Sequence, residues 1–283
     1  MIVRCPPAGP LSKGAQFVAN DLLLDRQSDG ITMIRLNRAE ARNALTMDMA
    51  RRLTALLGEV DADPDCRVLV LVAEGAVFCA GLDLKAALAG PDAPSSAIEW
   101  MTLQEIFAGL MRRINSLRQP VIAAVQGAAV GAGFGLALAC DIRIAASDVK
   151  FLVGAVNVGL SAGECGISYH LPRLIGAGRA FEIMLTGRPV TADEALASGL
   201  VSHVVEPEAL FDRALQTARA IAANAPYSIK HSKQVTWSNL EAPSLSSAIE
   251  LENHVQVVAL MSNDFREAAT AFSEKRAPRF TGR

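Results

Sequence analysis

Over its first two hundred or so residues the chain alternates short apolar runs with longer segments of helical hydrophobic period. The apolar runs contain β-branched residues and are bounded by turn residues, which is typical of strands. Val121–Val125, which precedes a cluster of glycines, has the pattern of a buried strand. The expected strands are Leu22–Leu24, Ile31–Leu36, Val68–Val72, Val121–Val125, Ile142–Ala146 and Lys150–Val153.

Segments with apolar residues three and four positions apart predict helices between and after these strands. Thr46 is expected to cap one of them, because a hydroxyl can accept a hydrogen bond from the first helical turn. Gly199 is expected to end another, and beyond Pro207 nearly the whole chain follows the helical pattern. The expected helices include the one after Thr46, the amphipathic segment Ala97–Leu117, a helix from about Arg179 to Leu185 and one begun by the capping box Thr191–Glu194.

This order of elements predicts an α/β fold with a repeating strand–strand–helix rhythm and a helical C-terminal region. We expect three parts along the chain. Residues 1–16, rich in proline and glycine, form a flexible arm; residues 17–205 form the α/β core; residues 206–283 form the helical region.

Composition narrows the class of protein. The 283 residues carry a net charge of −2, so no basic surface for nucleic acid is expected. The N-terminus lacks the apolar core of a signal peptide. The cysteines are odd in number and scattered, which favours reduced thiols in a cytoplasm over a disulfide framework or a zinc site. They are Cys5, Cys66, Cys79, Cys140 and Cys165.

The stretch Pro120–Asp141 combines a strand, four glycines and the Ala/Leu-rich start of a helix. Such a turn leaves backbone N–H groups without partners at a helix N-terminus, where they can hold developing negative charge. A membrane span is disfavoured because the run is mostly Ala and Gly, with no aromatic belt or basic flank. The spacing of Gly131, Gly133 and Gly135 does not match a dinucleotide fingerprint. Glycines that merely let a helix pack closely on a sheet stay an open alternative.

Two segments that each follow a buried strand, Phe78–Lys85 and Val130–Gly133, resemble the oxyanion-hole segments of the crotonase (enoyl-CoA hydratase/isomerase) superfamily. Three more segments agree in order. Asn37–Leu45 is similar to the family's coenzyme A-binding loop, Leu185–Val201 to its post-site segment, and Ala271–Arg276 to its C-terminal motif. The resemblance covers about residues 18–280 and implies a crotonase-like spiral of strand–strand–helix units.

The resemblance implies that the backbone N–H groups of Leu82 and Ala132 point at the carbonyl oxygen of an acyl-CoA thioester. Two such donors would stabilise the negative charge that builds on that oxygen as an enolate forms. The family usually carries glycine where Ala132 stands, but alanine keeps the N–H group. No permanently bound cofactor is implied, and coenzyme A enters as part of the substrate.

The same resemblance places six residues near the 3′-phosphoadenosine end of coenzyme A. Phe272 and Lys275 would come from a neighbouring subunit, whereas solvated surface lysines are the alternative for Lys85 and Lys275. The six are Ala41, Arg42, Leu84, Lys85, Phe272 and Lys275.

The family assembles through its C-terminal helices into trimers, which often pair into hexamers. In this chain the segment 244–273 has more apolar positions than a monomer core needs to bury. We therefore expect a homotrimer or hexamer whose partner is an acyl-CoA and neither a membrane nor a nucleic acid.

Hydratases of this family use two glutamates to place and activate water, and those positions map onto Gly135 and Ala155. Neither residue can transfer a proton. Glu164 lies between glycines in the loop where related dehalogenases and some isomerases carry an active-site carboxylate. An apolar pocket would raise its pKa and suit it to a proton shuttle. The alternative is a glutamate that only interacts with a helix N-terminus.

Several other polar residues have simpler interpretations. Asp83 is expected to cap the next helix and Asp141 to close the central one, whereas Tyr169 and His170 are expected to pack. Cys79 is expected to be a small buried apolar residue. Trp100, Met101 and Phe107 would line the acyl chain.

Two functional hypotheses from different classes remain. The first is an acyl-CoA thioester enzyme that works through an enolate, most simply an enoyl-CoA isomerase with Glu164 as the proton shuttle, with hydration as the second choice. The second is a non-catalytic acyl-CoA-binding or assembly protein on the same scaffold.

Overall fold

The computed structural model describes residues 16–19 and 21–282, and a seven-stranded sheet runs through its centre. The sheet order is β1–β2–β3–β4–β5–β7–β10; the first three strands pair antiparallel and the others parallel. Residues 1–15 of the expected arm, and Cys5 with them, lie outside the described residues. The strands are β1 (Gln16–Ala19), β2 (Leu22–Arg26), β3 (Ile31–Leu36), β4 (Val68–Ala73), β5 (Val121–Val125), β7 (Ile142–Ala146) and β10 (His203–Val205).

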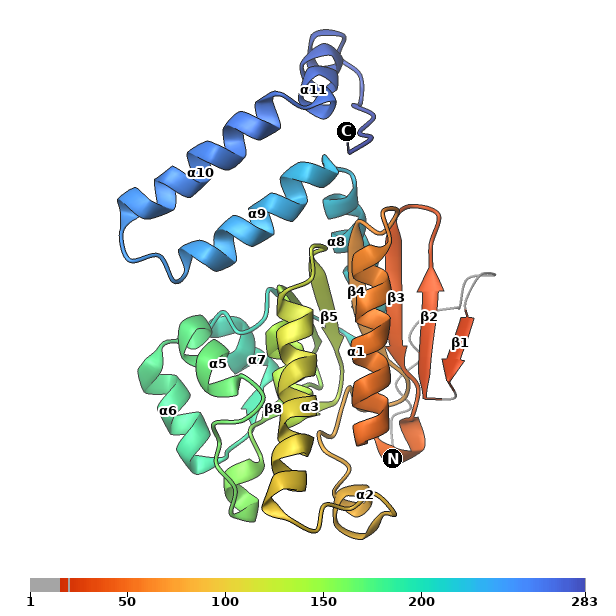
Figure 1. The fold of residues 1–283 in the computed structure, drawn as a ribbon, viewed down its shortest axis with the longest axis vertical. Helices are drawn as coiled ribbons and strands as arrows, with labels where there is room; N and C mark the ends of the chain where they lie inside the picture. The colour runs from red at the N-terminus through yellow and green to blue at the C-terminus, as the bar shows by residue number, and fades with distance from the viewer. Residues whose placement is uncertain (1–15, 20, 283) are drawn as a thin grey trace.

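Both faces of this sheet are covered by helices, which explains why β4 is apolar at every position. Val68 belongs to the core shared with α8 (Leu210–Ala222), whereas Leu69 belongs to the core shared with α1 (Met47–Ala62) and α3 (Ala97–Asn115). Successive side chains of a strand point to opposite faces, so the two cores take alternate residues. Figure 1 shows α1 and α3 running side by side along one face.

A second, three-stranded sheet branches off directly after β5. It contains β6 (Ala128–Val130), β8 (Lys150–Leu152) and β9 (Val190–Thr191). The chain turns into it at Gly127, where φ is +60° and a Cβ would lie 1.8 Å from the Ala76 carbonyl oxygen. Glycine is required there on both counts. Strands β1, β6, β9 and β10 were not predicted, because segments of two to four residues show little of the alternating pattern of a strand.

The remaining helices divide between the body and an extended arm. Thr46 accepts a hydrogen bond from Met49 N–H at 3.1 Å, and Thr191 caps a helix in the same way, as predicted. In Figure 1 the hairpin of α9 and α10, with α11 beyond it, stands away from the body. The helices not yet placed are α2 (Leu84–Ala89), α4 (Ala132–Ala139), α5 (Ile167–Ile175), α6 (Ala177–Thr186), α7 (Ala192–Ala197), α9 (Pro226–Asn239), α10 (Leu245–Leu260) and α11 (Asn263–Ser273), with 3₁₀ turns at Ala39–Ala41, Ala155–Val158 and Pro207–Ala209.

The helical region expected over residues 206–283 divides into a part that packs on the sheet and a part that does not. Helix α8 covers one face of the sheet, whereas no residue of α9 or α10 is buried as a whole. Among the described residues no helix combines the length and the apolar character that crossing a membrane requires. The four cysteines of the described part are free thiols.

Candidate functional site

The segment that follows β4 runs against β6 with the two backbones in direct contact. Cys79 N–H donates to the Ala128 carbonyl oxygen at 3.1 Å, and Val130 N–H donates to the Cys79 carbonyl oxygen at 3.0 Å. A Cβ on Gly133 would lie 2.3 Å from Cys79 O, and one on Gly81 would lie 2.6 Å from Val130 O. Any side chain at either glycine would overlap the neighbouring backbone, so the two glycines permit the contact.

Two main-chain donors lie at this junction. Ala132 is the first residue of α4, so its N–H has no acceptor inside the helix. The Cβ position of Gly81 is 3.4 Å from Ala132 N, which puts the following Leu82 peptide beside the start of α4. Within the described part of the chain no backbone carbonyl accepts a hydrogen bond from either N–H. Two unpaired donors at a helix N-terminus suit an oxygen that carries negative charge.

Glu164 lies in the loop before α5, directly beside the start of α4. Its Oε1 is 3.2 Å from the Cβ position of Gly131, the residue that precedes Ala132. Burial raises the pKa of the Glu164 carboxyl to about 7. Burial therefore raises the pKa of Glu164 as predicted. With this pKa the carboxyl can both take up and release a proton near neutral pH.

Gly135 and Cys165 fix the approach of this loop. A Cβ on Gly135 would lie 2.7 Å from both the Cβ and the carbonyl oxygen of Cys165. Gly131, the N-cap of α4, and Gly135 are one turn apart, so the start of the helix presents two positions without side chains to the loop that carries Glu164. Cys165 has a left-handed backbone with φ of 47°. The space that a glutamate at position 135 would need is thus filled by the backbone of the loop.

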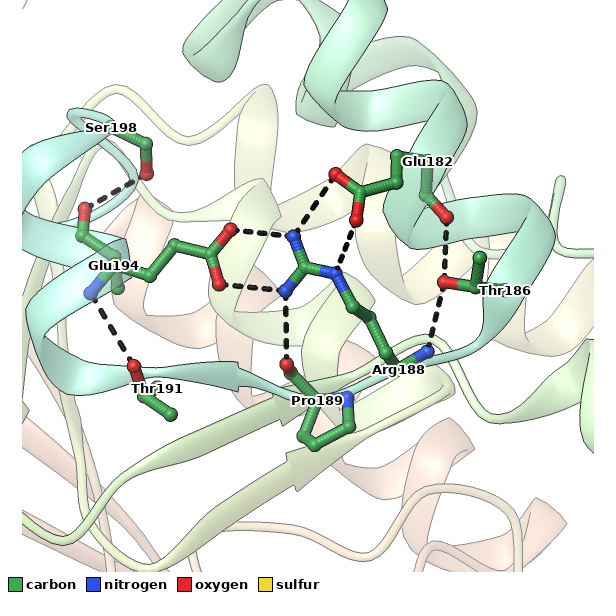
Figure 2. A network of polar contacts seen from close by, with 8 residues as sticks. Glu182, Thr186, Arg188, Pro189, Thr191, Glu194 and Ser198 are labelled. Carbon is green, nitrogen blue, oxygen red and sulfur yellow. Dashed lines mark hydrogen bonds and ion pairs between the residues drawn. The ribbon is translucent and has the colours of Figure 1, made fainter.

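Ala155 is buried in the 3₁₀ turn Ala155–Val158, and an ion-pair network after α6 holds this turn. Figure 2 shows Arg188 between two glutamates: it donates to both oxygens of Glu194 at 2.7 Å and to those of Glu182 at 2.8 and 3.2 Å. Hydrogen bonds from Arg188 lower the pKa of both carboxyls. Asn157 donates to the backbone next to Arg188 at 3.2 Å, so the network ties the turn to α6 and α7.

Four of the six residues expected near coenzyme A lie together. The Ala80 N–H donates to the Arg42 carbonyl oxygen at 3.0 Å, which lays the loop of Ala41 and Arg42 along the segment that leads to Leu84 and Lys85. The Arg42 and Lys85 side chains are exposed. Buried Asn43 supports this loop, because its amide donates to two backbone carbonyls at 2.8 Å each.

Phe272 and Lys275 do not join that group within one chain. Phe272 is 88% exposed near the end of α11, and Lys275 follows that helix. Figure 1 shows α11 and α2 at opposite ends of the molecule. Among the residues expected to line the acyl chain, Phe107 is instead buried in the core and Met101 is 63% exposed.

Asp141 was expected to close the central helix, but Cys140 is the C-cap of α4 and Asp141 follows it. The Asp141 carboxylate accepts hydrogen bonds from Val121 N–H and from Trp237 Nε1, each at 2.7 Å, and pairs with Lys233 at 2.8 Å. Sequence reasoning missed these contacts because Trp237 lies 96 residues further along the chain. The spacing of Lys233 and Trp237, one turn apart on a mostly polar helix, was the available signal. Asp83 caps α2 as predicted and also pairs with Arg38 at 2.7 Å.

Comparisons with known proteins agree with this geometry. The family model described as enoyl-CoA hydratase/isomerase matches residues 26–283. A probable enoyl-CoA hydratase from Mycobacterium bovis is 40% identical, with 98% of each chain covered. A 1,2-epoxyphenylacetyl-CoA isomerase from Escherichia coli is 36% identical, covering 93% of this chain and 99% of that protein.

Solved structures agree as well. A probable enoyl-CoA hydratase/isomerase from Mycobacterium abscessus is 38% identical with a TM-score of 0.85, covering 93% of this chain and 99% of that one. An enoyl-CoA hydratase from Bacillus anthracis is 31% identical with a TM-score of 0.88, covering 93% of this chain and 100% of that one.

The raised pKa of Glu164 predicts a pH dependence of stability. In the unfolded chain this carboxyl ionises near its ordinary pKa of about 4.3, whereas in the folded protein it keeps its proton until about 7. Between these values the unfolded state binds fewer protons, so the free energy of unfolding falls as pH rises. Glu164→Gln cannot ionise, so it does not lose this stability as pH rises. We therefore expect the Tm of the variant, relative to that of the wild type, to be higher at about pH 8 than at about pH 5.

Calorimetric melting of both proteins at the two pH values checks this expectation. Glu208→Gln, at an exposed position far along the chain, is the control and should give the same difference from wild type at both. Equal gains for Glu164→Gln at the two pH values would contradict a raised pKa.

Proposed function

Because this chain belongs to the enoyl-CoA hydratase/isomerase family, as its motifs had indicated, we propose that it moves the double bond of an enoyl-CoA thioester. The N–H groups of Leu82 and Ala132 would hold the thioester oxygen, and Glu164 would carry the proton. The observation that carries the proposal is the 3.2 Å approach of Glu164 Oε1 to the Cβ position of Gly131, one residue from the donor on Ala132.

The two donors supply the electrostatic part of the proposal. Removing a proton next to a thioester carbonyl leaves an enolate whose negative charge lies largely on that oxygen. Each preorganised donor in a site of this kind lowers the barrier by about 3 kcal/mol. Because both belong to the main chain, Ala132 can serve where the family usually has glycine.

Glu164 supplies the proton transfer. As a carboxylate it takes one proton from the α- or γ-carbon, and the electron pair of that C–H bond delocalises onto the thioester oxygen. The carboxylic acid then returns the proton to the other carbon, which completes the shift of the double bond with no net change in atoms. A pKa of about 7 keeps both forms of Glu164 populated near neutral pH.

Hydration is the less favoured reaction at this site. Water addition in this family relies on two glutamates, and the matching positions here are Gly135 and Ala155. Loss of one positioned acid or base slows a reaction by about 10²–10⁴. The contact of Gly135 with Cys165 also leaves no room for a carboxylate at the first of these positions.

A non-catalytic acyl-CoA-binding protein is the competing proposal from another class. It predicts tight binding of acyl-CoAs with no change in their mass or double-bond position. The half-buried carboxyl of Glu164, which pairs with no cation among the described residues, favours the enzyme, because a binding protein gains nothing from the desolvation of that group.

We expect Glu164→Gln to abolish deuterium exchange and double-bond migration in an enoyl-CoA while coenzyme A thioesters still bind. The amide matches the shape of the acid but cannot accept the proton. Wild-type protein should hydrate crotonyl-CoA slowly or not at all. Mass spectrometry of crotonyl-CoA in heavy water reports exchange and hydration together. Rapid hydration by the wild type, or unchanged exchange in Glu164→Gln, would refute the assignment.

Coenzyme A would bind along the loop of Ala41 and Arg42 and the first turn of α2. The exposed cations Arg42 and Lys85 are suited to its phosphates. This part of the site is supported by the backbone contacts that lay the two segments together.

Lys85→Glu should therefore raise the Kd for coenzyme A about 10-fold, because it replaces attraction to a phosphate by repulsion. Raising the salt concentration should weaken binding to the wild type. Isothermal titration calorimetry measures both effects. Arg179→Glu, which makes the same charge reversal at an exposed position of α6, should leave the Kd unchanged. Equal affinities for wild type and Lys85→Glu would remove Lys85 from the site.

The assembly is proposed to be a homotrimer or hexamer. None of the 16 residues of α10 is buried, although the helix is rich in apolar side chains. An exposed apolar surface of this kind is typical of an interface. In such an assembly Phe272 and Lys275 would reach a neighbour's coenzyme A site, which is consistent with their distance from α2 in one chain. The exposed apolar residues of α10 are Leu245, Ile249, Val257, Val258 and Leu260.

Light scattering at micromolar concentration should give the mass of a trimer or hexamer. Val258→Asp, which puts a charge on the exposed face of α10, should shift the population to smaller species. A wild-type monomer under these conditions would exclude the proposed assembly.

A further inference from the structure

Helix α9 lies beside the body and is joined to it by a few contacts. None of its residues is buried as a whole, and two hollows border it. A groove of about 620 Å³ lies between α9 and the end of α4, and a pocket of about 480 Å³ lies between α9, α3 and α5. Trp237 lines both. Since apolar packing is sparse here, a few directed contacts set the position of α9 relative to the body.

The first of these contacts joins α9 to the end of α4. Trp237 Nε1 and Lys233 Nζ bind opposite oxygens of the Asp141 carboxylate, at 2.7 and 2.8 Å. The Lys233 side chain is only 7% exposed, and its ammonium also donates to the Gln119 carbonyl oxygen at 2.9 Å. A charge pair with so little access to water holds its geometry firmly, because separating the partners leaves a buried charge. Asp141 follows the helix whose first residue is Ala132.

The second contact joins α9 to α5. The Trp237 ring meets His170 edge-on with ring centroids 5.5 Å apart, and His170 meets Tyr169 edge-on at 5.0 Å. The Tyr169 hydroxyl donates to the Glu241 carboxylate just beyond the end of α9, and the Arg173 guanidinium stacks 3.7 Å from the Tyr169 ring. His170 is 7% exposed, and its ring packs between Tyr169 and Trp237.

These contacts link the two elements that carry the proposed chemistry. Helix α4 begins with the donor on Ala132, and α5 begins three residues after Glu164. We propose that Trp237 and Tyr169 are positioning residues: through them α9 clamps the end of α4 to α5 and thereby fixes the Glu164 carboxylate relative to the Ala132 N–H. Neither side chain touches the substrate. The inference rests on the proposed function for its effect on rate, but its effect on the surroundings of Glu164 can be tested separately.

Loosening the clamp has a defined consequence at Glu164. If α5 shifts away from α4, water reaches the carboxyl and the cause of its raised pKa weakens. In the part of the chain that the structure describes, the titratable group that interacts with Glu164 is the thiol of Cys165, whose pKa burial raises to about 12, so it is neutral. A change in the pKa of Glu164 therefore reports on its solvation.

The test uses Trp237→Phe, which keeps a ring against His170 but loses the hydrogen bond to Asp141, and Tyr169→Phe, which loses only the hydroxyl. Thr236→Val is the matched control, because within the described residues Thr236 Oγ1 donates only to the Ser232 carbonyl oxygen of its own helix. Carbon NMR titration of ligand-free protein with labelled glutamate gives the pKa of Glu164, assigned by the signal missing in Glu164→Gln. Deuterium exchange into crotonyl-CoA gives kcat and KM.

Both phenylalanine variants should lower the pKa of Glu164 by about one unit and slow kcat about 10-fold with KM unchanged, whereas Thr236→Val should move neither. If the pKa of Glu164 stays the same in both variants, the inference is wrong, and a fall in Tm alone would assign these contacts to stability only. If the wild type exchanges no deuterium, the proposed function fails, and the titration still decides the inference. Should Trp237→Phe not fold, Tyr169→Phe provides both readings.

Discussion

The contact between the backbone after β4 and the backbone of β6 is the constraint on which the site depends. The two main chains exchange hydrogen bonds as a parallel β bridge, and next to the bridge they stay this close only because side chains are missing between them. Gly81 and Gly133 provide that clearance, and Gly127 lets the chain leave β5 in the required direction. The same contact leaves the Leu82 and Ala132 amides side by side at a helix N-terminus. Fold and electrostatics thus follow from a single packing condition.

Desolvation of Glu164 is the second condition on which the site depends. Because Gly131 and Gly135 have no side chains, the loop that carries Glu164 packs directly against the start of α4. The carboxyl of Glu164 loses contact with water there, and this raises its pKa to about 7. The low dielectric that makes this carboxylate a better base also strengthens hydrogen bonds from main-chain donors to an anionic oxygen. Under the proposed function, one desolvated space therefore serves both the proton carrier and the charge it creates.

The sequence predicted those parts of the fold that repeat a period or carry a cap. The strands β3, β4 and β5, the helix begun by Thr46 and the mixed α/β class were confirmed, because each rests on several residues with one physical preference. Strand β6 was missed because it has three residues, and its pairing is set by the chain around it. The partners of Asp141 could not be predicted either, since Trp237 reaches it only through the tertiary fold.

At the site, the motifs predicted which main-chain segments lie together, whereas they did not predict the shape of the space between them. The sequence shows that position 135 carries a glycine and no carboxylate. Only the structure shows that Cys165 fills the space that a side chain at this position would take. A glutamate at 135 and the present course of the Glu164 loop therefore exclude each other. Under the proposed function, restoring the two-carboxylate arrangement for water would require moving the loop that carries the single proton shuttle. The contact between α4 and this loop therefore disfavours hydration together with the missing carboxylate at Ala155, while the backbone donors stay the same.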